Sequence, residues 1–393
     1  MEPVTVRSVV LAGGGTAGHV NPLLAVADGL RTRNPETALL VLGTETGLEA
    51  DLVPARGYPL RPVPKVPLPR RPSADIFRLP GRLKTAIAAA DAALTEIDAD
   101  VVVGFGGYVS TPAYIAAHRR GIPIVVHEQN ARPGLANRLG ARWAARVGVT
   151  FPGTALRDAV VTGLPLRPEI ADLIARRSSN ADAVRVEAAA VLDLNPALPT
   201  ILVTGGSLGA VSINGAVAGA ARALLDSGAQ ILHLTGKNKD EAVRQGIRAA
   251  TTGMLTSHAE GWDVSTLKHY YVRDYLPDMH YALACADLVI ARAGAGTVCE
   301  LAALGIPAVY VPLPIGNGEQ FLNAAPLVAA GGGVLVDDAA FTSAWVADQV
   351  PDLLAGTAAL TAMGRAAAEF GVRDGASRLV DLIDQAAAEG ATR

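Results

Sequence analysis

Short apolar runs that end in glycine alternate with stretches of helical periodicity along most of this chain. In the first half, four such runs occur at residues 6–11, 38–42, 100–103 and 122–126. Each has the length of a strand and lacks the polar alternation of a strand with one face in water, so we expect strands covered on both faces. The pattern therefore predicts a parallel β-sheet with helices on both sides.

The same organisation restarts near residue 200. An apolar run at 200–203 leads into the glycine turn GGSLGA, residues 205–210, and then into a predicted helix over 211–225. Further strands are predicted at residues 230–234, 271–272, 288–291, 307–311 and 333–336. Strand, glycine turn and alanine-rich helix thus occur twice, which indicates two α/β domains of similar architecture and not a short-period repeat.

A proline-containing break separates the two halves. The sequence TGLPLRPE, residues 162–169, interrupts the pattern, and the segment 170–198 is rich in alanine and charged residues. We interpret this segment as an interdomain linker plus one helix, with domains over residues 1–166 and 167–371. Two doubly wound domains would place the carboxyl ends of their sheets on a shared cleft, where such folds bind ligands.

Composition supports this architecture and excludes some classes of protein. The chain has 393 residues, more than one core needs, and it is 50% hydrophobic but only 4% aromatic. Its formal net charge of −3 gives no electrostatic case for nucleic-acid binding. Cys285 and Cys299 lie in alanine-rich surroundings without metal-ligand spacing, so we expect buried free thiols. We find no signal peptide and no apolar run long enough to span a membrane, and we expect a cytoplasmic protein; these observations leave contact with a membrane surface open.

The first glycine turn has the spacing of a dinucleotide site. Residues 12–22, AGGGTAGHVNP, contain the pattern G-x-G-x-x-G of dinucleotide-binding enzymes. Such enzymes carry a ribose-binding acid at the end of the second strand, but here that strand ends at Gly43, and Glu45 lies beyond it. This mismatch disfavours an NAD enzyme.

More glycine turns precede predicted helices than one dinucleotide requires. They lie at residues 13–18, 104–107, 205–209 and 293–297. Helix N-termini present free amide N–H groups and a partial positive charge, so these turns suit phosphate groups. Each turn taken alone is also typical of an ordinary tight connection between strand and helix. Together they favour a protein that holds two separate diphosphates, one on each side of a cleft.

Six motifs, taken in order, resemble those of a known family. The motifs are GGGTAGHVNP, GFGGYVSTP, HEQNARPGLANR, TGLPLRPE, GGSLGAVSIN and ARAGAGTVCELAALGIPAVYVPLPIGNGEQFLNA. They are similar to motifs of the undecaprenyldiphospho-muramoylpentapeptide β-N-acetylglucosaminyltransferases, in glycosyltransferase family 28 of the GT-B superfamily. The resemblance runs from about residue 9 to residue 371 and is specific to this combination of motifs.

The resemblance implies both a fold and an activity. The fold is GT-B, with two Rossmann-like domains facing a central cleft and a helix over about 372–393 that crosses back to the first domain. The activity is an inverting transfer of GlcNAc from UDP-GlcNAc to the 4-hydroxyl of MurNAc in undecaprenyl-pyrophosphoryl-MurNAc-pentapeptide, called lipid I below. No cofactor and no catalytic metal are expected. The implied location is peripheral, on the anionic cytoplasmic face of the plasma membrane, beside other cell-wall synthesis proteins.

The resemblance places UDP-GlcNAc mainly on the second domain. Glu300, one turn into the helix after RAGAGT, has two carboxylate oxygens that suit both ribose hydroxyls, and Gln320 presents an amide to the sugar. Either side chain could also belong to a solvated helix face. The residues implied to contact the donor are Thr16, Ala17, Gly18, Asn130, Arg167, Ser207, Leu276, Ala295, Gly296, Thr297, Glu300 and Gln320.

The first domain is implied to hold the acceptor and the catalytic base. The implied site for the diphosphate of lipid I consists of Gly14, Gly15, Gly106, Gly107 and Tyr108. His19 and Glu128 are both candidates for the base that takes the proton from the acceptor hydroxyl. An imidazole titrates near neutral pH, and Glu128 follows a buried strand. The sequence leaves the choice between them open.

The leaving UDP needs charge stabilisation, which many transferases obtain from a metal held by a D-x-D motif after a strand. The match in this chain, Asp98-Ala-Asp100, precedes its strand instead. We therefore expect helix N-termini, with Arg292 or Arg167, to neutralise the developing charge without a metal.

The segment 65–84 combines basic and apolar residues against a single acid, Asp75. Basic residues attract anionic lipid, and apolar side chains enter the interface. The alternative is a solvated loop whose phenylalanine packs back on the domain. The predicted membrane patch consists of Ile76, Phe77, Arg78, Leu79, Arg82 and Lys84.

Two departures from the family pattern affect the donor side. Leu208 stands where many relatives carry glutamine, and Glu319 with Gln320 replaces a common pair of glutamines, which puts a second amide contact to the sugar in doubt. Two other functions remain as alternatives. One is another UDP-GlcNAc enzyme of this fold, such as a soluble glycosyltransferase or a 2-epimerase. The other is a non-catalytic, nucleotide-sugar-binding partner protein at the membrane.

Overall fold

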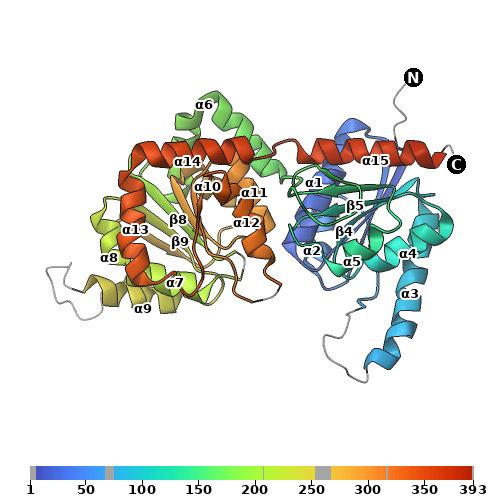
Figure 1. Cartoon of the computed structure of the whole chain (residues 1–393), viewed down its shortest axis with the longest axis horizontal. Coiled ribbons are helices and arrows are strands. Elements are labelled where there is room, and N and C mark those ends of the chain that lie inside the picture. Colours follow the sequence, from blue (N-terminus) through green and yellow to red (C-terminus); the bar gives the residue numbers. More distant parts are fainter. Residues whose placement is uncertain (1–5, 67–74, 207, 253–266, 316, 392–393) are drawn as a thin grey trace. The chain divides into compact units, whose positions relative to one another are not determined.

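The chain folds into two compact α/β units (Figure 1). Unit 1 comprises Met1–Pro168 and Val372–Arg393, and unit 2 comprises Glu169–Gly371. The chain therefore passes from one unit to the other twice. The computed structural model describes residues 6–66, 75–206, 208–252, 267–315 and 317–391.

Unit 1 is built on a parallel sheet with the strand order β3-β2-β1-β4-β5-β6-β7 among its described residues. The strands are β1 (Ser8–Gly13), β2 (Ala38–Gly43), β3 (Leu60–Pro62), β4 (Val101–Gly106), β5 (Ile124–Glu128), β6 (Arg146–Val149) and β7 (Ala159–Val161). The helices are α1 (Ala17–Arg33), α2 (Leu48–Ala55), α3 (Asp75–Glu96), α4 (Ser110–Arg120), α5 (Leu135–Gly140) and α15 (Gly375–Ala391). This is the strand order of a doubly wound sheet with one further strand at the edge.

The four apolar runs of the first half form β1, β2, β4 and β5, as predicted. The sequence did not predict β3, β6 and β7. Strands β3 and β7 lie at the two edges of the sheet and expose most of their residues, so neither forms an apolar run. Strand β6 begins with an arginine and is only four residues long.

Successive residues of the strands in unit 1 point to opposite faces of the sheet and enter two separate cores. Val9 and Leu11 of β1 pack with side chains of α1 and α15. Val10 and Ala12 of the same strand pack with side chains of α3 and α4. The continuous apolar runs are thus explained by helices on both faces.

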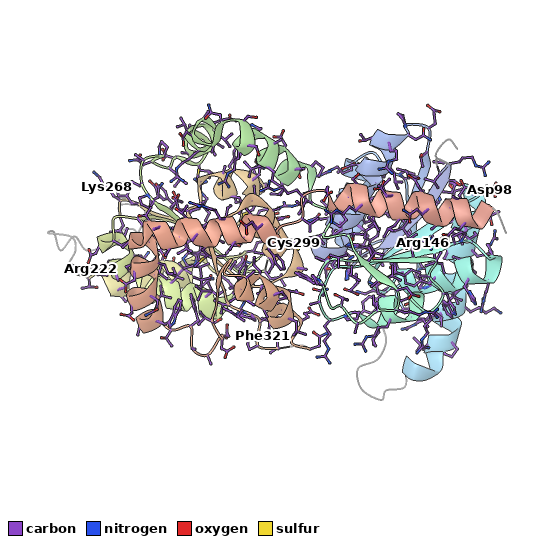
Figure 2. The ribbon with its side chains drawn as sticks, turned by 45° about the horizontal axis from the view of Figure 1, so that its top comes forward. Asp98, Arg146, Arg222, Lys268, Cys299 and Phe321 are labelled. Atoms are coloured by element: carbon purple, nitrogen blue, oxygen red, sulfur yellow. The ribbon has the colours of Figure 1, made fainter. Side chains whose placement is uncertain are left out.

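Helix α15 completes unit 1 although it comes from the end of the chain. Its residues Leu379 and Ile383 are fully buried in the core beneath α1. Arg146, at the start of β6, forms an ion pair with Glu389 of this helix (Figure 2). The C-terminal helix therefore closes one face of the first sheet.

Unit 2 contains a second parallel sheet, with the order β10-β9-β8-β11-β12-β13 among its described residues. The strands are β8 (Thr200–Thr204), β9 (Gln230–Leu234), β10 (Tyr270–Arg273), β11 (Leu288–Ala291), β12 (Ala308–Tyr310) and β13 (Val334–Leu335). The helices are α6 (Pro168–Leu192), α7 (Val211–Gly219), α8 (Ala221–Asp226), α9 (Asp240–Thr251), α10 (Met279–Cys285), α11 (Ala295–Leu304), α12 (Glu319–Ala329), α13 (Ser343–Ala355) and α14 (Thr357–Phe370). Each of these strands overlaps a predicted strand.

The helix predicted over 211–225 is divided into α7 and α8. The division lies at Ala220, whose φ of −98° and ψ of 5° are not helical. Gly219 precedes it, and a side chain at this position would overlap the hydroxyl of Ser343 in α13. The close approach of α13 therefore coincides with the break.

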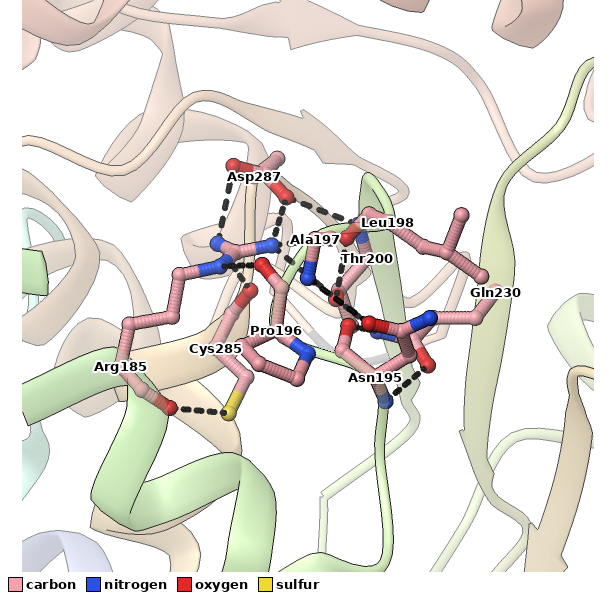
Figure 3. A network of polar contacts seen from close by, with 9 residues as sticks. All are labelled: Arg185, Asn195, Pro196, Ala197, Leu198, Thr200, Gln230, Cys285 and Asp287. Carbon is pink, nitrogen blue, oxygen red and sulfur yellow. Dashed lines mark hydrogen bonds and ion pairs between the residues drawn. The ribbon is translucent and has the colours of Figure 1, made fainter.

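The segment 170–198, interpreted as a linker plus one helix, is a fixed part of unit 2. It forms α6, which bends at Asn180, and the loop that leads into β8. Arg185 of α6 binds both carboxylate oxygens of Asp287, at 3.1 Å and 2.9 Å (Figure 3). Its guanidinium also donates to the carbonyl oxygens of Pro196, Leu198 and Cys285. The predicted helix is present as α6, and only the interpretation of the rest as an interdomain linker is corrected, because this network attaches the segment to the second sheet.

Helix α3 carries the predicted membrane patch. Leu79 is half-buried and packs, with Leu83, against the core of unit 1, whereas Arg82 and Lys84 are exposed. The side chains of Ile76, Phe77 and Arg78 lie outside the described residues. In the part of the chain that the structure describes, no helix is both long enough and apolar enough to cross a bilayer.

Candidate active site

Each sheet reverses its strand order at one point, and glycine turns follow the strands on both sides of it. The order reverses between β1 and β4 in unit 1 and between β8 and β11 in unit 2. Ligands of doubly wound sheets bind outside the carboxyl ends of the strands at this point. The glycine turns predicted at 13–18, 104–107, 205–209 and 293–297 lie at the carboxyl ends of these four strands, and residues 104–106 form the last part of β4 itself. Each unit therefore has a pair of turns where its fold is expected to bind a ligand.

The two glycine turns of unit 1 are packed against each other. A side chain at Gly107 would overlap the carbonyl oxygen of Gly14. A Cβ atom at Gly106 would lie 3.2 Å from Nε2 of His19 and 3.3 Å from Nδ2 of Asn137. Gly106 and Gly107 also have positive φ angles, 94° and 81°. Glycine is required at both positions, for space and for backbone conformation.

His19 lies in the first turn of α1, and the turn before it holds its ring. Nδ1 is 3.2 Å from the carbonyl oxygen of Gly14 and 3.1 Å from Oγ1 of Thr16. A carbonyl oxygen only accepts hydrogen bonds, so the contact with Gly14 places the ring hydrogen on Nδ1. In the neutral form of this half-buried ring, Nε2 beside Gly106 is then the nitrogen with a lone pair that can accept a proton.

Glu128, at the end of β5, is buried and binds the loop that follows it. Oε1 accepts the N–H of Asn130 at 3.0 Å, and Oε2 accepts the N–H of Gly134 at 3.0 Å. The amide of Asn137 also donates to Oε2, at 2.9 Å. The carboxylate thus has three donors from its own unit and only 2% exposure. This arrangement suits a group that shapes a loop better than one that removes a proton from a substrate.

Asn137 is a residue that the sequence analysis missed. Its amide nitrogen lies beside Gly106 and donates to Glu128, and its side-chain oxygen accepts the hydroxyl of Tyr114 at 2.8 Å. Asn137 therefore connects the Glu128 loop to the turn after β4. Its place within ANR of the motif HEQNARPGLANR was the available signal.

A second missed carboxylate lies behind the first glycine turn. Glu49, in the first turn of α2, is fully buried. Oε2 accepts the N–H of Gly15 at 2.9 Å, and Oε1 accepts the N–H and the hydroxyl of Thr44 at 2.9 Å and 2.6 Å. Burial acts to raise the pKa of Glu49, but the hydrogen bonds from Thr44 and Gly15 outweigh it and hold that pKa below its ordinary value. The carboxylate of Glu49 therefore connects the turns after β1 and β2 through hydrogen bonds.

A pocket of about 290 Å³ opens in front of these two turns. Tyr108 is 40% exposed on its wall, and the Nζ atom of Lys65 lies 5.6 Å from the centre of the tyrosine ring. The pocket combines main-chain amides, hydroxyls, the cation of Lys65, the carboxylate of Asp51 and an aromatic ring. Its lining consists of Gly14, Gly15, Thr44, Thr46, Gly47, Leu48, Asp51, Lys65, Tyr108 and Val109.

In unit 2, the turn after β8 is tightly folded against the end of β9. Gly209 has a φ of 68°, and a side chain there would overlap the carbonyl oxygen of Thr235. The Nζ atom of Lys239 donates to the carbonyl oxygen of Leu208 at 2.6 Å, while the Leu208 side chain is 81% exposed. Ser207, implied to bind the diphosphate, lies outside the described residues.

Helix α11 begins directly after the turn that follows β11. Gly294 is its N-cap, and Ala295, Gly296 and Thr297 form its first turn. A Cβ atom at Gly294 or Gly296 would meet nothing within 4 Å, so their backbone borders open space. Glu300 is half-buried one turn further on. The helix thus offers amide N–H groups and a carboxylate on neighbouring turns.

Gln320, near the start of α12, has a fixed side-chain amide. Its Oε1 atom accepts the N–H of Leu313 at 3.0 Å. The carboxamide is therefore oriented so that its nitrogen remains the donor for a sugar hydroxyl. Cys299, next to Glu300 in α11, is a free half-buried thiol (Figure 2), and Cys285 is free and buried.

Arg292, expected to neutralise the leaving group, is engaged within unit 2. Its Nη1 atom binds Oδ1 of Asp338 at 2.5 Å and the carbonyl oxygens of Val311 and Pro312. Its Nη2 atom donates to the hydroxyl of Ser212, which in turn donates to Asp338 at 2.6 Å. These five residues, defined here as the Arg292 cluster, connect the segments that follow β8, β11, β12 and β13. The guanidinium charge is thus paired with Asp338.

The other residues implied to contact the donor divide between the units. Thr16 and Gly18 are exposed in unit 1, and Leu276 is half-buried in the loop after β10 of unit 2. Ala17, Asn130 and Arg167 are half-buried in unit 1. The D-x-D match lies elsewhere, because Asp100 binds the guanidinium of Arg7 at the amino ends of β1 and β4.

Both halves of the sequence match one enzyme family. Residues 9–149 match the glycosyltransferase family 28 N-terminal domain, and residues 200–379 match the glycosyltransferase family 28 C-terminal domain. The chain belongs to glycosyltransferase family 28. Among its relatives is the UDP-N-acetylglucosamine–N-acetylmuramyl-(pentapeptide) pyrophosphoryl-undecaprenol N-acetylglucosamine transferase of Bifidobacterium longum strain DJO10A. The two are 51% identical, over 96% of this chain and 97% of the relative. The protein of the same description from a Nocardioides strain is 52% identical, over 95% of this chain and 97% of the relative.

Solved structures agree with the assignment to family 28. The crystal structure of Acinetobacter baumannii MurG has a TM-score of 0.73 and 28% identity, and the match covers 96% of this chain and 99% of that one. The UDP-GlcNAc 2-epimerase of Neisseria meningitidis has a TM-score of 0.65 at 14% identity over 96% of this chain and 99% of that one, so it shares the fold alone. The predicted GT-B fold, with two Rossmann-like domains, is confirmed.

Proposed function

We propose that this family 28 enzyme transfers N-acetylglucosamine from UDP-GlcNAc to lipid I, which forms lipid II in peptidoglycan synthesis. The observation that carries the proposal is the 51% identity with the B. longum transferase over 96% of the chain. That identity spans both domains, so it includes the ligand-binding turns of both sheets.

The donor side of the proposal rests on unit 2. Glu300 accepts the ribose hydroxyls, and Gln320 donates its Nε2 hydrogens to the sugar. The first turn of α11, with the free amides of Ala295 and Gly296, binds the diphosphate and stabilises the charge that develops on leaving UDP. Thr297, Leu276 and Ser207 complete the donor contacts in this unit. Arg292 acts here through the loops that it binds.

The catalytic side rests on His19. Its Nε2 atom takes the proton from the 4-hydroxyl of MurNAc as that oxygen attacks the anomeric carbon on the side opposite to UDP, which inverts the configuration. The hydrogen bond from Nδ1 to Gly14 supports this role, because in the neutral ring it places the hydrogen on Nδ1 and leaves the lone pair of Nε2 to accept the proton. Glu128 contributes by holding the loop from Asn130 to Gly134 and the amide of Asn137.

The acceptor side rests on the glycine turns of unit 1. Gly14, Gly15, Gly106, Gly107 and Tyr108 surround the diphosphate of lipid I, and the basic and apolar segment at the start of α3 contacts anionic lipid. The enzyme then works as a peripheral protein on the cytoplasmic face of the plasma membrane. Other cell-wall synthesis proteins are its expected neighbours there.

The experiment that tests the proposal follows label from UDP-[¹⁴C]GlcNAc into a lipid-extractable product, with a lipid I analogue as acceptor and EDTA present. We expect labelled lipid and released UDP in equal amounts. Label in free sugar alone, or none in the lipid fraction, would indicate a different enzyme of the same fold. Activity that disappears in EDTA and returns with magnesium would contradict the metal-free step.

A further inference from the structure

We propose that Glu49 is a positioning residue for the acceptor, which holds the glycine turn of unit 1 in the shape that binds pyrophosphate. The inference rests on the proposed function, because it takes the pocket in front of Gly14 and Gly15 as the acceptor site. It adds a residue that no motif in the sequence analysis marked.

The carboxylate of Glu49 bridges the turns after β1 and β2. Glu49 is fully buried, and three donors from two different turns bind its two oxygens. Oε2 accepts a hydrogen bond from the N–H of Gly15, and Oε1 accepts hydrogen bonds from the N–H and the hydroxyl of Thr44. Glu49 thus fixes the distance between the turn after β1 and the turn after β2.

Glycines surround the side chain of Glu49 at positions where a larger residue would overlap it. A Cβ atom at Gly14, Gly43 or Gly47 would overlap atoms of Glu49. Gly15 has a φ of 87°, and a Cβ atom there would meet nothing within 4 Å, so its glycine serves the backbone conformation and not packing. The hydrogen bond between Gly15 and Glu49 therefore holds the backbone conformation of the turn after β1.

The buried carboxylate of Glu49 carries a negative charge. A carboxylate that accepts three hydrogen bonds in a buried site stays ionised, and the pKa of Glu49 is held below its ordinary value. The ionised carboxylate of Glu49 accepts the N–H of Gly15. We infer that the other N–H groups of this turn bind the ligand. Glu49 lies behind Gly15 and Thr44, both of which line the pocket, so its own oxygens do not contact the ligand. It acts through the two residues that it binds.

The contacts of Glu49 indicate which substrate depends on its carboxylate. The residues that Glu49 holds all belong to unit 1, and they line the pocket with Tyr108 and Lys65. The donor contacts with Glu300 and Gln320 belong to unit 2. Loss of the carboxylate should therefore weaken acceptor binding and leave UDP-GlcNAc binding intact.

The test compares Glu49→Gln with the matched control Glu45→Gln. The glutamine has the same shape, but its NH₂ group faces one of the three donors and leaves it unpaired. Glu45 is an exposed carboxylate on the same loop and lines no part of the pocket. We expect the acceptor KM of Glu49→Gln to rise about tenfold, with the donor KM within about twofold of the wild type. Glu45→Gln should behave like the wild type.

A second variant covers the case in which Glu49→Gln does not fold. Thr44→Val removes the hydroxyl that donates at 2.6 Å and keeps the backbone N–H. It should raise the acceptor KM in the same direction, by about threefold. Binding of undecaprenyl pyrophosphate to each variant, measured by calorimetry, should weaken in parallel, and thermal unfolding should report the folded fraction.

Two results would overturn the inference. One is a kcat that falls with the folded fraction while both KM values stay at wild-type levels, which would make Glu49 purely structural. The other is an unchanged affinity for undecaprenyl pyrophosphate in both variants. Failure of the proposed function looks different, because the wild-type protein itself would then transfer no label to lipid I.

Discussion

At the scale of single residues, the tautomer of His19 decides which atom is able to act as a base. Its Nδ1 atom is bound to Gly14 and Thr16, and Nε2 borders Gly106, where a Cβ atom would lie 3.2 Å away. The ring therefore presents its unprotonated nitrogen next to a glycine that leaves room for a substrate hydroxyl. Glu128 lacks this freedom, since both of its oxygens are already bound.

The first prediction concerns His19→Gln. The amide retains hydrogen-bonding capacity but has no basicity at neutral pH, so we expect single-turnover transfer to slow about 10²- to 10⁴-fold. Affinity for UDP-GlcNAc, measured by calorimetry, should stay within about twofold, because Glu300 and Gln320 remain in place. A rate within about tenfold of the wild type would show that another group takes the proton.

A second histidine, His127, serves stability. It is fully buried at the end of β5, where Nε2 is 3.0 Å from the carbonyl oxygen of Gly163 and Nδ1 is 3.1 Å from the amide nitrogen of Gln129. The amide of Gln129 donates to Nδ1, so the ring is neutral with its hydrogen on Nε2. Burial lowers the pKa of His127 to about 4.

The second prediction follows from that pKa. The unfolded chain binds a proton on this ring near pH 6.5, and the folded chain binds it only near pH 4. The stabilisation is therefore complete above the higher value and is lost as the pH falls from there towards the lower one. Between about pH 7.5 and about pH 5, His127 should account for a loss of about 2 kcal/mol in the free energy of unfolding of unit 1.

Urea unfolding of wild type and His127→Gln at the two pH values measures this loss. The variant is less stable at both, but its stability should fall less on acidification. His233 in unit 2, whose burial lowers its pKa to about 3, contributes with the same sign and is unchanged in the variant. An equal fall in both proteins would mean that His127 does not titrate in this range.

At the scale of elements, the Arg292 cluster connects four segments at the carboxyl end of the second sheet. Arg292 follows β11, Ser212 lies in α7 after β8, Pro312 follows β12, and Asp338 follows β13. The side chains of Arg292 and Asp338 are 11% and 19% exposed, so their ion pair is shielded from water. Such a pair fixes loops in place even where its net contribution to stability is small.

The third prediction is that Asp338→Asn raises the KM for UDP-GlcNAc about tenfold and leaves the acceptor KM unchanged. The asparagine keeps the shape but removes the charge opposite Arg292, and the segments that carry Gln320 and α11 lose a common anchor. Asp337→Asn is the matched control, because Asp337 is the exposed neighbour. A rise in the acceptor KM instead would contradict the assignment of the donor to this unit.

Strands of the sheet interior were predictable because burial on both faces produces apolar runs. This held for β1, β4, β8 and β11, whose residues are all buried. Edge strands β3 and β7 give no such signal. The helix in the segment 170–198 was predicted, but its attachment to the second sheet was not, because that attachment depends on the long-range contacts of Arg185.

Candidate site residues were predictable where a motif joins them to a glycine turn, as for His19 and Glu300. No motif spacing pairs Glu49 with Gly15, which lies 34 residues earlier in another loop. The pairing of Arg292 with Asp338 spans 46 residues for the same reason. Side chains that act by holding a turn depend on contacts that only the folded chain defines, and these are what the sequence analysis lacked.

At the scale of the whole molecule, each unit has its own cores. The clusters around β1 and β4 draw all their members from unit 1, and the cluster around β8 and β11 draws its members from unit 2. A chain of this kind need not unfold in one step, so a single free energy of unfolding does not describe it. Stability gained from a ligand should then appear first in the unit that binds it.

The last prediction uses this independence to locate the donor. A ligand at about one hundred times its Kd adds about 2.7 kcal/mol to the stability of the state that binds it. With UDP-GlcNAc at that level, hydrogen exchange should slow in peptides from the ends of β8 and β11 and from α11 and α12. Peptides from β2, α2 and α4 of unit 1 should exchange as they do without ligand.

Glu300→Gln is the matched variant, because it keeps the side-chain shape and removes the charge proposed to bind ribose. At the same UDP-GlcNAc concentration it should show weaker protection in unit 2 and unchanged exchange in unit 1. Protection that instead centred on residues 13–18 and survived this substitution would place the nucleotide on the first sheet. The roles of the two units would then be reversed, since the turn held by Glu49 would bind the donor and not the acceptor.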